Sequence, residues 1–310
     1  AGGQFGAILS SSDGFTWTVR NPVALSTPTT IKSIAFGNNT FVAVGSSTVH
    51  QSIDNGITWN SRQIGDFGSG YLYRVIYANN LFVAVGDDGW IFTSPDGLTW
   101  SNRSLPLPGQ KFFDIVFANG LYVIISYWGD VFTSTDAVAW TRTSFAGYYR
   151  YAIGYMNGTF VTVGNDNVAY TSNDGITWTS HAIPASLYRI PVINGKFIGA
   201  GTGGEILESN DGVIWTDGTT RITRNTLKSI AYGNGIFISI ESNNDPFTNI
   251  FSSPDGIAWT PLPPLPGSMR INRIKFVNGM FYLLCYDSVF VSQNGMNWTS
   301  VLSGQYNAQF

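Results

Sequence analysis

Three arginines, Arg74, Arg189 and Arg273, stand at one equivalent position in three copies of an internal repeat, early in a strand of each copy. Asp114 occupies the same position in a fourth copy. If these strands line a common channel, the four side chains gather near one mouth and form a candidate ligand-binding site. The alternative is that the arginines are spaced charges that neutralise neighbouring aspartates. The sequence leaves both interpretations open.

A second set of candidate residues lies in the loops between the second and third strands of the repeats, which should open on the same face. Aromatic faces there offer stacking surface, and polar side chains fix the orientation of a ligand. We therefore select Trp90, Tyr127 and Trp128 as candidate ligand-binding residues. The alternative is that these aromatics fill the channel and seal the repeats. The acidic residues of the same loops are Asp87, Asp88, Asp130, Asp166, Glu205, Glu241, Asp245 and Asp287.

Residues that catalysis would need are scarce. A hydrolytic mechanism with two carboxylates would have to draw on a very small supply of glutamate. Two histidines and a single cysteine show no zinc-ligand spacing, and no glycine-rich phosphate loop leads into a helix. We therefore predict no catalytic residue, no cofactor and no metal, and keep hydrolase activity as an alternative. The only glutamates are Glu205, Glu208 and Glu241.

The composition narrows the classes of partner. The net charge is −3 and only 11% of residues are charged, so the chain has no electrostatic footprint for nucleic acid or an anionic membrane. No apolar run approaches the roughly 20 residues of a membrane helix, and we expect no membrane insertion. Hydrophobic residues make up 44% of the 310, enough for a large core. We expect the single cysteine, Cys285, to be buried in an apolar strand.

A short motif that occurs eight times predicts the strands and turns that position these residues. It consists of a serine, an aspartate, a glycine and a tryptophan, and we call it the repeated phrase. Successive tryptophans are 37 to 44 residues apart, a period that predicts a β-propeller with one four-stranded blade per repeat. We expect the aspartate to accept N–H bonds within its own turn and the tryptophan to bury its ring. These structural residues are Asp13 and Trp17, Asp54 and Trp59, Asp96 and Trp100, Asp136 and Trp140, Asp174 and Trp178, Asp211 and Trp215, Asp255 and Trp259, and Trp298 with Asn294 in place of the aspartate.

Each repeat divides into four short strands rich in β-branched and aromatic residues. Asn-Gly pairs such as Asn119-Gly120 predict tight type I′ hairpins after the first strand. Seven such hairpins but eight tryptophan phrases occur, because residues 5–20 supply an extra pair of strands. We predict an all-β fold of about seven four-stranded blades in a single domain over residues 1–310. In the alternative, residues 5–20 and the tail Gln305–Phe310 complete an eighth blade or close the ring.

The repeated phrase resembles the Asp-box, or BNR repeat, of sialidases and related β-propellers. Residues 52–59, Ser-Ile-Asp-Asn-Gly-Ile-Thr-Trp, match the usual spelling, whereas the other copies lack one residue between aspartate and glycine. The fourth copy has Ala137 for glycine. In that family the boxes lie on the face opposite the active site, and sialidase activity would need three arginines, a tyrosine nucleophile backed by a glutamate, and an aspartate. The tetrapeptide at residues 188–191, Tyr-Arg-Ile-Pro, is similar to one in sialidases, although ordinary repeat variation explains it equally well.

These observations favour a non-catalytic binding module that recognises a glycan or a glycosylated surface. The low charge and abundance of small polar residues also resemble virion, tail or secreted proteins, so we expect a virion or extracellular location. The alternatives are a structural scaffold with a protein partner in a larger assembly and a sialidase-like glycoside hydrolase.

Overall fold

The computed structural model describes residues 8–20, 30–64, 70–144, 149–201, 203–217, 223, 225–242, 248–265, 271–285 and 288–303. Regular structure in these residues is antiparallel strand, apart from one short 3-10 turn, η2 (Asp87–Gly89). None of the described segments forms a helix long and apolar enough to cross a membrane. The chain divides into two compact units, residues 1–146 with 307–310, and residues 147–306.

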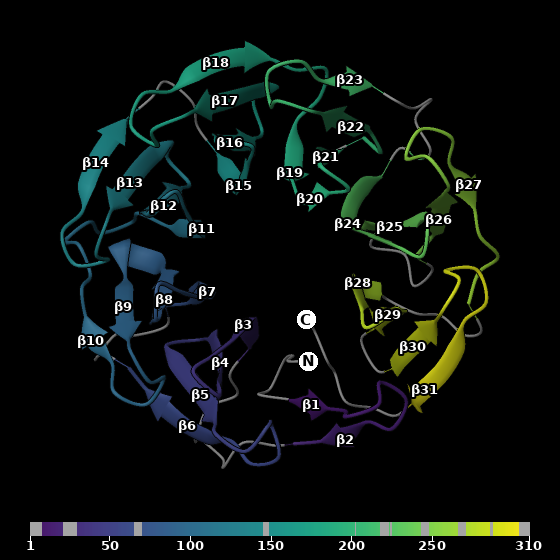
Figure 1. The fold of residues 1–310 in the computed structure, drawn as a ribbon, viewed down its shortest axis with the longest axis horizontal. Helices are drawn as coiled ribbons and strands as arrows, with labels where there is room; N and C mark the ends of the chain where they lie inside the picture. The colour runs from purple at the N-terminus through teal and green to yellow at the C-terminus, as the bar shows by residue number, and fades with distance from the viewer. Residues whose placement is uncertain are drawn as a thin grey trace. The chain divides into compact units, whose positions relative to one another are not determined.

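The first unit contains a two-stranded hairpin and three four-stranded blades (Figure 1). Within each blade the strands follow one another across the sheet in chain order. The hairpin is β1 (Leu9–Ser10) and β2 (Thr18–Val19); blade 1 is β3 (Ile31–Gly37), β4 (Thr40–Gly45), β5 (Thr48–Ser52) and β6 (Asn60–Gln63); blade 2 is β7 (Leu72–Ala78), β8 (Leu81–Gly86), β9 (Ile91–Ser94) and β10 (Ser101–Asn102); blade 3 is β11 (Phe112–Ala118), β12 (Leu121–Ser126), β13 (Asp130–Ser134) and β14 (Thr141–Ser144).

The second unit contains four blades. In blade 5 the first strand is divided in two at Pro191, which has no N–H for a strand ladder. Blade 4 is β15 (Arg150–Met156), β16 (Thr159–Gly164), β17 (Val168–Ser172) and β18 (Thr179–Ala182); blade 5 is β19 (Leu187–Arg189), β20 (Val192–Ile193), β21 (Lys196–Gly201), β22 (Ile206–Ser209) and β23 (Thr216–Asp217); blade 6 is β24 (Thr226–Gly233), β25 (Ile236–Ser242), β26 (Ile250–Ser253) and β27 (Thr260–Pro261); blade 7 is β28 (Ile271–Val277), β29 (Met280–Cys285), β30 (Ser288–Ser292) and β31 (Thr299–Ser303).

Seven blades of this kind make the fold a seven-bladed β-propeller, which confirms the fold predicted from the repeat. The hairpin β1–β2 is the extra pair of strands, and its Ile8 end packs against Ile31, Ala43 and Trp59 of blade 1. The tail Gln305–Phe310 lies outside the described residues. Ring closure through the tail and a single domain over residues 1–310 stay predictions.

The hairpin between the first two strands of a blade has the predicted type I′ geometry. Asn119 and Gly120 have φ values of 52° and 73°, so both central residues are left-handed, as that turn requires. Glycine tolerates this region without strain, and asparagine is among the few other residues that visit it. The Asn-Gly signal was therefore enough to place these turns.

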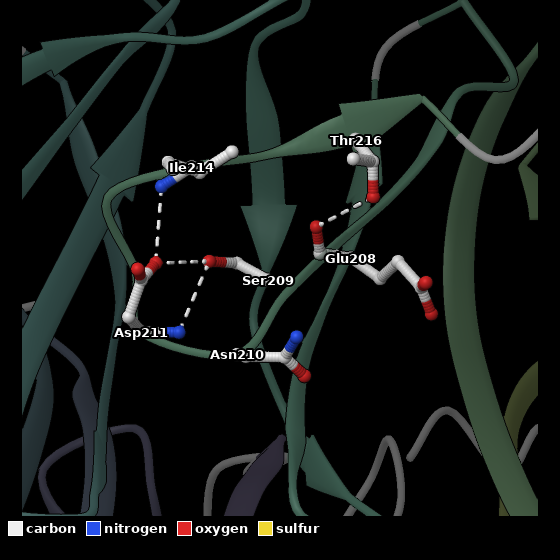
Figure 2. A pocket seen from close by; sticks show the side chains of 6 residues that line it. All are labelled: Glu208, Ser209, Asn210, Asp211, Ile214 and Thr216. Atoms are coloured by element: carbon white, nitrogen blue, oxygen red, sulfur yellow. Dashed lines mark hydrogen bonds between the residues drawn. The ribbon is translucent and has the colours of Figure 1, made fainter.

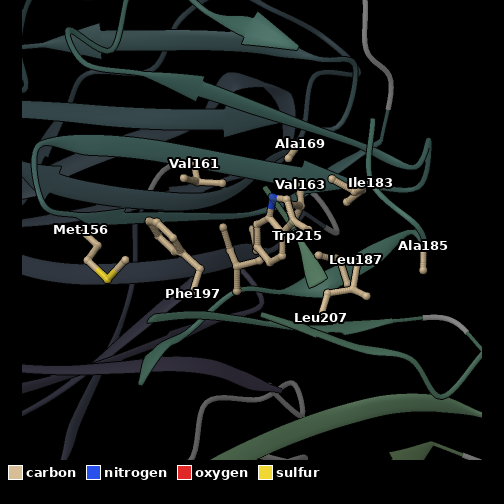
Figure 3. Packing of buried hydrophobic residues seen from close by; sticks show 12 residues of the cluster. Met156, Val161, Val163, Ala169, Ile183, Ala185, Leu187, Phe197, Leu207 and Trp215 are labelled. Atoms are coloured by element: carbon tan, nitrogen blue, oxygen red, sulfur yellow. The ribbon is translucent and has the colours of Figure 1, made fainter. Parts of the chain in front are cut away.

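Neighbouring blades pack through apolar clusters that include the tryptophan of the repeated phrase. Trp215, after β22 of blade 5, lies against Val161 and Val163 of blade 4 and Leu187 of blade 5 (Figure 3). Only 8% of Trp215 is exposed. The ring therefore fills the space between two blades.

Candidate functional site

All seven first strands carry a β-bulge near their start: the extra residue is the second of the strand in six blades and the third in blade 6. In β7, for example, Leu72 pairs with Gly86 and Arg74 with Val85, so Tyr73 is the extra residue. A bulge disrupts the ladder locally and re-aims the side chain of the extra residue. We call these extra residues the bulge residues. In blades 1 to 6 they are Lys32, Tyr73, Phe113, Tyr151, Tyr188 and Lys228.

In the first unit, bulge residues of adjacent blades touch and continue into a loop. The ring centroids of Tyr73 and Phe113 are 5.1 Å apart, and those of Phe113 and Tyr127 are 5.5 Å apart. Tyr127 lies edge-on to Trp128 at 5.0 Å, and Trp128 is 49% exposed. We call Tyr73, Phe113, Tyr127 and Trp128 the aromatic band. It joins blades 2 and 3 into one surface of contacting, partly exposed rings.

A carboxylate fixes one end of the aromatic band. Asp87 accepts the Tyr73 hydroxyl at 2.9 Å and the backbone N–H of Tyr71 at 2.8 Å. Burial, together with the hydrogen bond to Asp87 and its charge, raises the pKa of Tyr73 well above its usual range. Tyr73 therefore holds its proton. Next to it, the Lys32 ammonium lies 5.4 Å from the centre of the exposed Tyr71 ring, a cation–π contact.

The second unit has a smaller aromatic contact between bulge residues. Tyr151 and Tyr188 stack with their centroids 4.7 Å apart. Lys228, in the next blade, has its pKa lowered by burial and then by the charge of Arg189. The charges of Lys228 and Arg189 are therefore close enough to act on each other.

The predicted residues Arg74 and Asp114 are brought together. Arg74 Nε lies 3.0 Å from Asp114 Oδ1, across the boundary between blades 2 and 3. The N–H is not directed at that oxygen, so the contact is an ion pair without a good hydrogen bond. The predicted alternative, arginines that neutralise aspartates, describes this pair. Arg189 and Arg273 belong to the second unit and Arg74 to the first, so a cluster of three arginines stays a prediction.

Trp90 requires a correction. Only 4% of it is exposed, and it packs in the core of blades 1 and 2. A Cβ on Gly70 would lie 2.1 Å from its ring, so the ring rests directly on that backbone. Trp90 offers no surface to a ligand in this structure, unlike Tyr127 and Trp128.

The candidate glutamates are held by other partners. Glu241 is fully buried and accepts hydrogen bonds from Thr223, Asn225 and Asn249. Glu205 is 7% exposed and accepts the N–H of Gly203 at 2.7 Å. These hydrogen bonds come from amide or hydroxyl donors of nearby residues. This geometry gives no support to a tyrosine nucleophile backed by glutamate.

The repeated serine–aspartate–glycine–tryptophan phrase, which we call the box, forms a closed set of hydrogen bonds. In the sixth box Asp211 Oδ1 accepts the Ser209 hydroxyl at 3.1 Å and the N–H of Ile214 at 3.0 Å (Figure 2). The Gly212 N–H donates to Ser209 Oγ, and the Trp215 indole N–H donates to the Gly212 carbonyl, both at 2.8 Å. Equivalent carboxylate bonds occur in all other boxes, with Asn294 as acceptor in the eighth. We propose on this basis that the boxes are structural turns.

These bonds stabilise the charged form of the box carboxylates. Bonds from the Thr58 hydroxyl and N–H lower the pKa of Asp54 to about 2, and the Thr177 N–H is the main cause of a pKa of about 2 at Asp174.

A hollow of about 180 Å³ lies at the sixth box, lined by Glu208, Ser209, Asn210, Asp211, Ile214 and Thr216 (Figure 2). No group of three or more histidine, cysteine, aspartate or glutamate side chains in the described residues is arranged to hold a metal.

Sequence reasoning missed the bulge residues Tyr73, Phe113, Tyr151 and Tyr188. They stand one position before the arginine column, and regular strand alternation gives no reason to single them out. The recurrence of an aromatic residue at this position in four consecutive repeats was the available signal.

Comparisons with known proteins place the chain among β-propellers. The model of the DUF6242 beta propeller domain matches residues 11–114, less than half of the chain. No curated protein matches the chain in sequence. Sqt1 of Saccharomyces cerevisiae has a similar structure, with a TM-score of 0.70 and 9% identity, covering 89% of this chain and 86% of Sqt1.

Two further structures show how different the proteins with this fold are. YCF48 bound to D1 peptide gives a TM-score of 0.62 and 19% identity, covering 85% of this chain and 91% of YCF48. Virginiamycin B lyase of Staphylococcus aureus gives 0.67 and 12%, covering 82% and 91%. At such identities the likeness shows the fold alone, since one propeller fold serves both peptide binding and catalysis.

Proposed function

We propose that this chain is a non-catalytic recognition propeller that binds its ligand on the aromatic band. The observation that carries the proposal is the unbroken contact of Tyr73, Phe113, Tyr127 and Trp128 across two blades, ending in a half-exposed indole. A fold gains little stability from leaving large rings partly in water, whereas a ligand can cover them.

The ligand class that we propose is a glycan, on its own or on a glycosylated surface. Sugar rings present flat C–H faces that suit aromatic stacking, and the hydroxyl and charged groups beside the band can fix their orientation. Asp88 accepts the N–H of Gly109, whose carbonyl accepts the indole N–H of Trp128, and Lys32 lies over Tyr71, two residues before Tyr73. A place in a virion or at a cell surface is consistent with such a ligand and stays a prediction, as does an Asp-box relationship.

A protein ligand is the second candidate. YCF48, a structural neighbour, is bound to D1 peptide. Rings with polar edges serve a peptide as well as a sugar, because tyrosine and tryptophan are favoured in protein interfaces. Hydrolysis is less well supported, since the hydroxyl of Tyr73 is held protonated and Glu241 is buried among amide and hydroxyl donors.

A glycan array, combined with an assay for sugar release from sialylated and neutral oligosaccharides, tests the proposal. We expect binding without release, lost in the Phe113→Ala/Trp128→Ala double variant. Release that depends on Glu205 or Glu241 would replace the proposal by a hydrolase. Absence of both binding and release would favour a protein partner.

A further inference from the structure

The box hairpins show a feature that neither the fold nor the aromatic band explains. In all eight boxes the residue after the glycine position is a large apolar residue, 38% to 56% exposed. We call these residues the box tips. They are Phe15, Ile57, Leu98 and Val138 in the first unit, and Ile176, Val213, Ile257 and Met296 in the second.

The turn itself does not require an apolar side chain at this position. Each box tip contributes only its backbone N–H to the carboxylate or amide oxygen of its box, as Ile176 does to Asp174 at 2.8 Å. Any residue except proline has that N–H. The identity of the tip changes from phenylalanine to methionine between copies, yet none of the eight is polar. Single exposed apolar residues are ordinary, but the same exposure in every repeat is not random scatter.

The charges around the box tips indicate what covers them. Seven of the eight boxes contain an aspartate, and no lysine or arginine occurs within any box. Hydrogen bonds from residues of the same turn lower the pKa of box carboxylates such as Asp54 and Asp174, so these carboxylates are ionised at neutral pH. A surface of apolar tips beside carboxylates is complementary to apolar residues flanked by lysine or arginine.

The same charges disfavour two other occupants. Anionic lipid would face carboxylates where juxtamembrane segments normally carry basic residues. A second copy docked box to box would set aspartates against aspartates, and like charges in contact are unfavourable.

We propose that the box tips of the second unit, Ile176, Val213, Ile257 and Met296, form a docking surface for a basic amphipathic segment of a partner protein, made of other residues than the aromatic band. The partner's apolar residues cover the tips, and its lysine or arginine side chains pair with the box carboxylates. A recognition propeller with a second docking surface would be tethered to a larger assembly while its ligand site stays free.

The test uses a fluorescein-labelled 18-residue amphipathic peptide of leucine and lysine, and a twin with glutamate in place of lysine. Anisotropy titrations compare the wild type with an Ile176→Thr/Val213→Thr/Ile257→Thr variant. A Val192→Thr/Val277→Thr variant is the matched control, because these valines are 43% and 49% exposed outside the boxes. We expect at least a tenfold weaker dissociation constant for the box variant only, and no binding of the glutamate twin.

Several results would overturn the docking proposal. Equal affinity of the box and control variants, or equal binding of the two peptides, would remove its basis. Self-association that disappears in the box variant would assign the tips to a second copy, and binding to phosphatidylserine vesicles that disappears likewise would assign them to lipid. If the triple variant folds poorly, Ile257→Thr alone should weaken peptide binding at an unchanged melting temperature.

Discussion

Arg74 of blade 2 forms an ion pair with Asp114 of blade 3, with 3.0 Å between Nε and Oδ1. Sequence comparison of the repeats assigns both residues to a ligand site, because they share one position in the first strand. The structure pairs them with each other, and each stands one residue after a bulge residue, Tyr73 or Phe113. The pair thus connects blades 2 and 3 at residues adjacent in sequence to two members of the aromatic band, and we expect it to help position the band.

A double-mutant cycle with Arg74→Met and Asp114→Asn measures this connection. The arginine and aspartate side chains are 36% and 14% exposed, so we expect a coupling of about 0.2–1 kcal/mol that weakens at high salt. Urea unfolding of the four proteins gives the coupling. No coupling, together with loss of ligand binding in Arg74→Met alone, would return Arg74 to the ligand site.

The glycine of a box adopts a left-handed backbone and also leaves room for a neighbouring blade. A pair of glycine variants separates these two effects. Gly97 has φ +75°, and a Cβ there would lie 2.8 Å from Val42 Cγ2 of blade 1. Gly158, with φ +84°, has nothing within 4 Å of such a Cβ. We expect Gly158→Ala to cost about 1 kcal/mol for the left-handed backbone, and Gly97→Ala about 2–4 kcal/mol because overpacking is added. Equal losses of unfolding free energy in the two variants would show that close packing of Gly97 against blade 1 does not contribute to the cost.

A buried arginine replaces the apolar residue that precedes the bulge in the other first strands. Arg150 is fully buried, pairs with Asp166, donates to the Val168 carbonyl at 2.9 Å and stacks over Tyr170. We expect Asp166→Ala to cost about 3–5 kcal/mol, because the guanidinium stays buried without its carboxylate.

Removing both charges should be far less costly. Arg150→Leu/Asp166→Ala should recover much of the loss, since blades 2 and 5 have Leu72 and Leu187 at this position. Lys196→Met, which breaks the more exposed pair with Glu208, is the control and should change stability by less than about 1 kcal/mol. A double variant as unstable as Asp166→Ala would contradict this account.

His50 gives the fold a defined acid sensitivity. It is 1% exposed, its Nδ1 lies 2.7 Å from Ser61 Oγ, and burial lowers its pKa from 6.5 to about 4. The unfolded chain therefore gains a proton at a higher pH than the folded chain does. Stability should be unaffected by His50 above pH 6.5 and should fall by about 3 kcal/mol as the pH decreases to about 4.

Urea unfolding across that window, for the wild type and His50→Gln, checks the acid sensitivity. The variant should lack this part of the decline. The box carboxylates do not interfere, because lowered pKa values such as that of Asp54, about 2, place their losses below pH 3.8. Parallel declines of the two proteins between pH 6.5 and 4 would contradict the assignment.

The sequence predicted the blades well because their signals are local. The aspartate, glycine and tryptophan of a box lie within seven residues, as Asp211 to Trp215 illustrate, and a type I′ turn needs only Asn119 and Gly120. These short-range features repeat with one period, so a propeller of about seven blades could be predicted, although counting left an eighth blade open.

The candidate site was only partly predicted because it depends on contacts between distant residues. The Trp90 ring packs against Gly70, twenty positions earlier in the chain. The residues next to Trp90 in the sequence give no signal that predicts this contact. Tyr73 and Phe113 meet because two bulges shift two strands, and strand alternation assumes that no shift occurs. Trp128 is exposed, as a residue of such a loop was expected to be, and its contact with a ligand stays a prediction.

The most direct test of the recognition function is the affinity of the aromatic-band variant for the tightest ligand from the glycan array, measured by calorimetry. Phe113→Ala/Trp128→Ala should weaken binding at least tenfold, about 1.4 kcal/mol, because it removes two stacking faces. Phe36→Ala, which alters a ring 52% exposed outside the band, should bind as the wild type does. A folded Phe113→Ala/Trp128→Ala protein with wild-type affinity would contradict the assignment of ligand binding to the aromatic band.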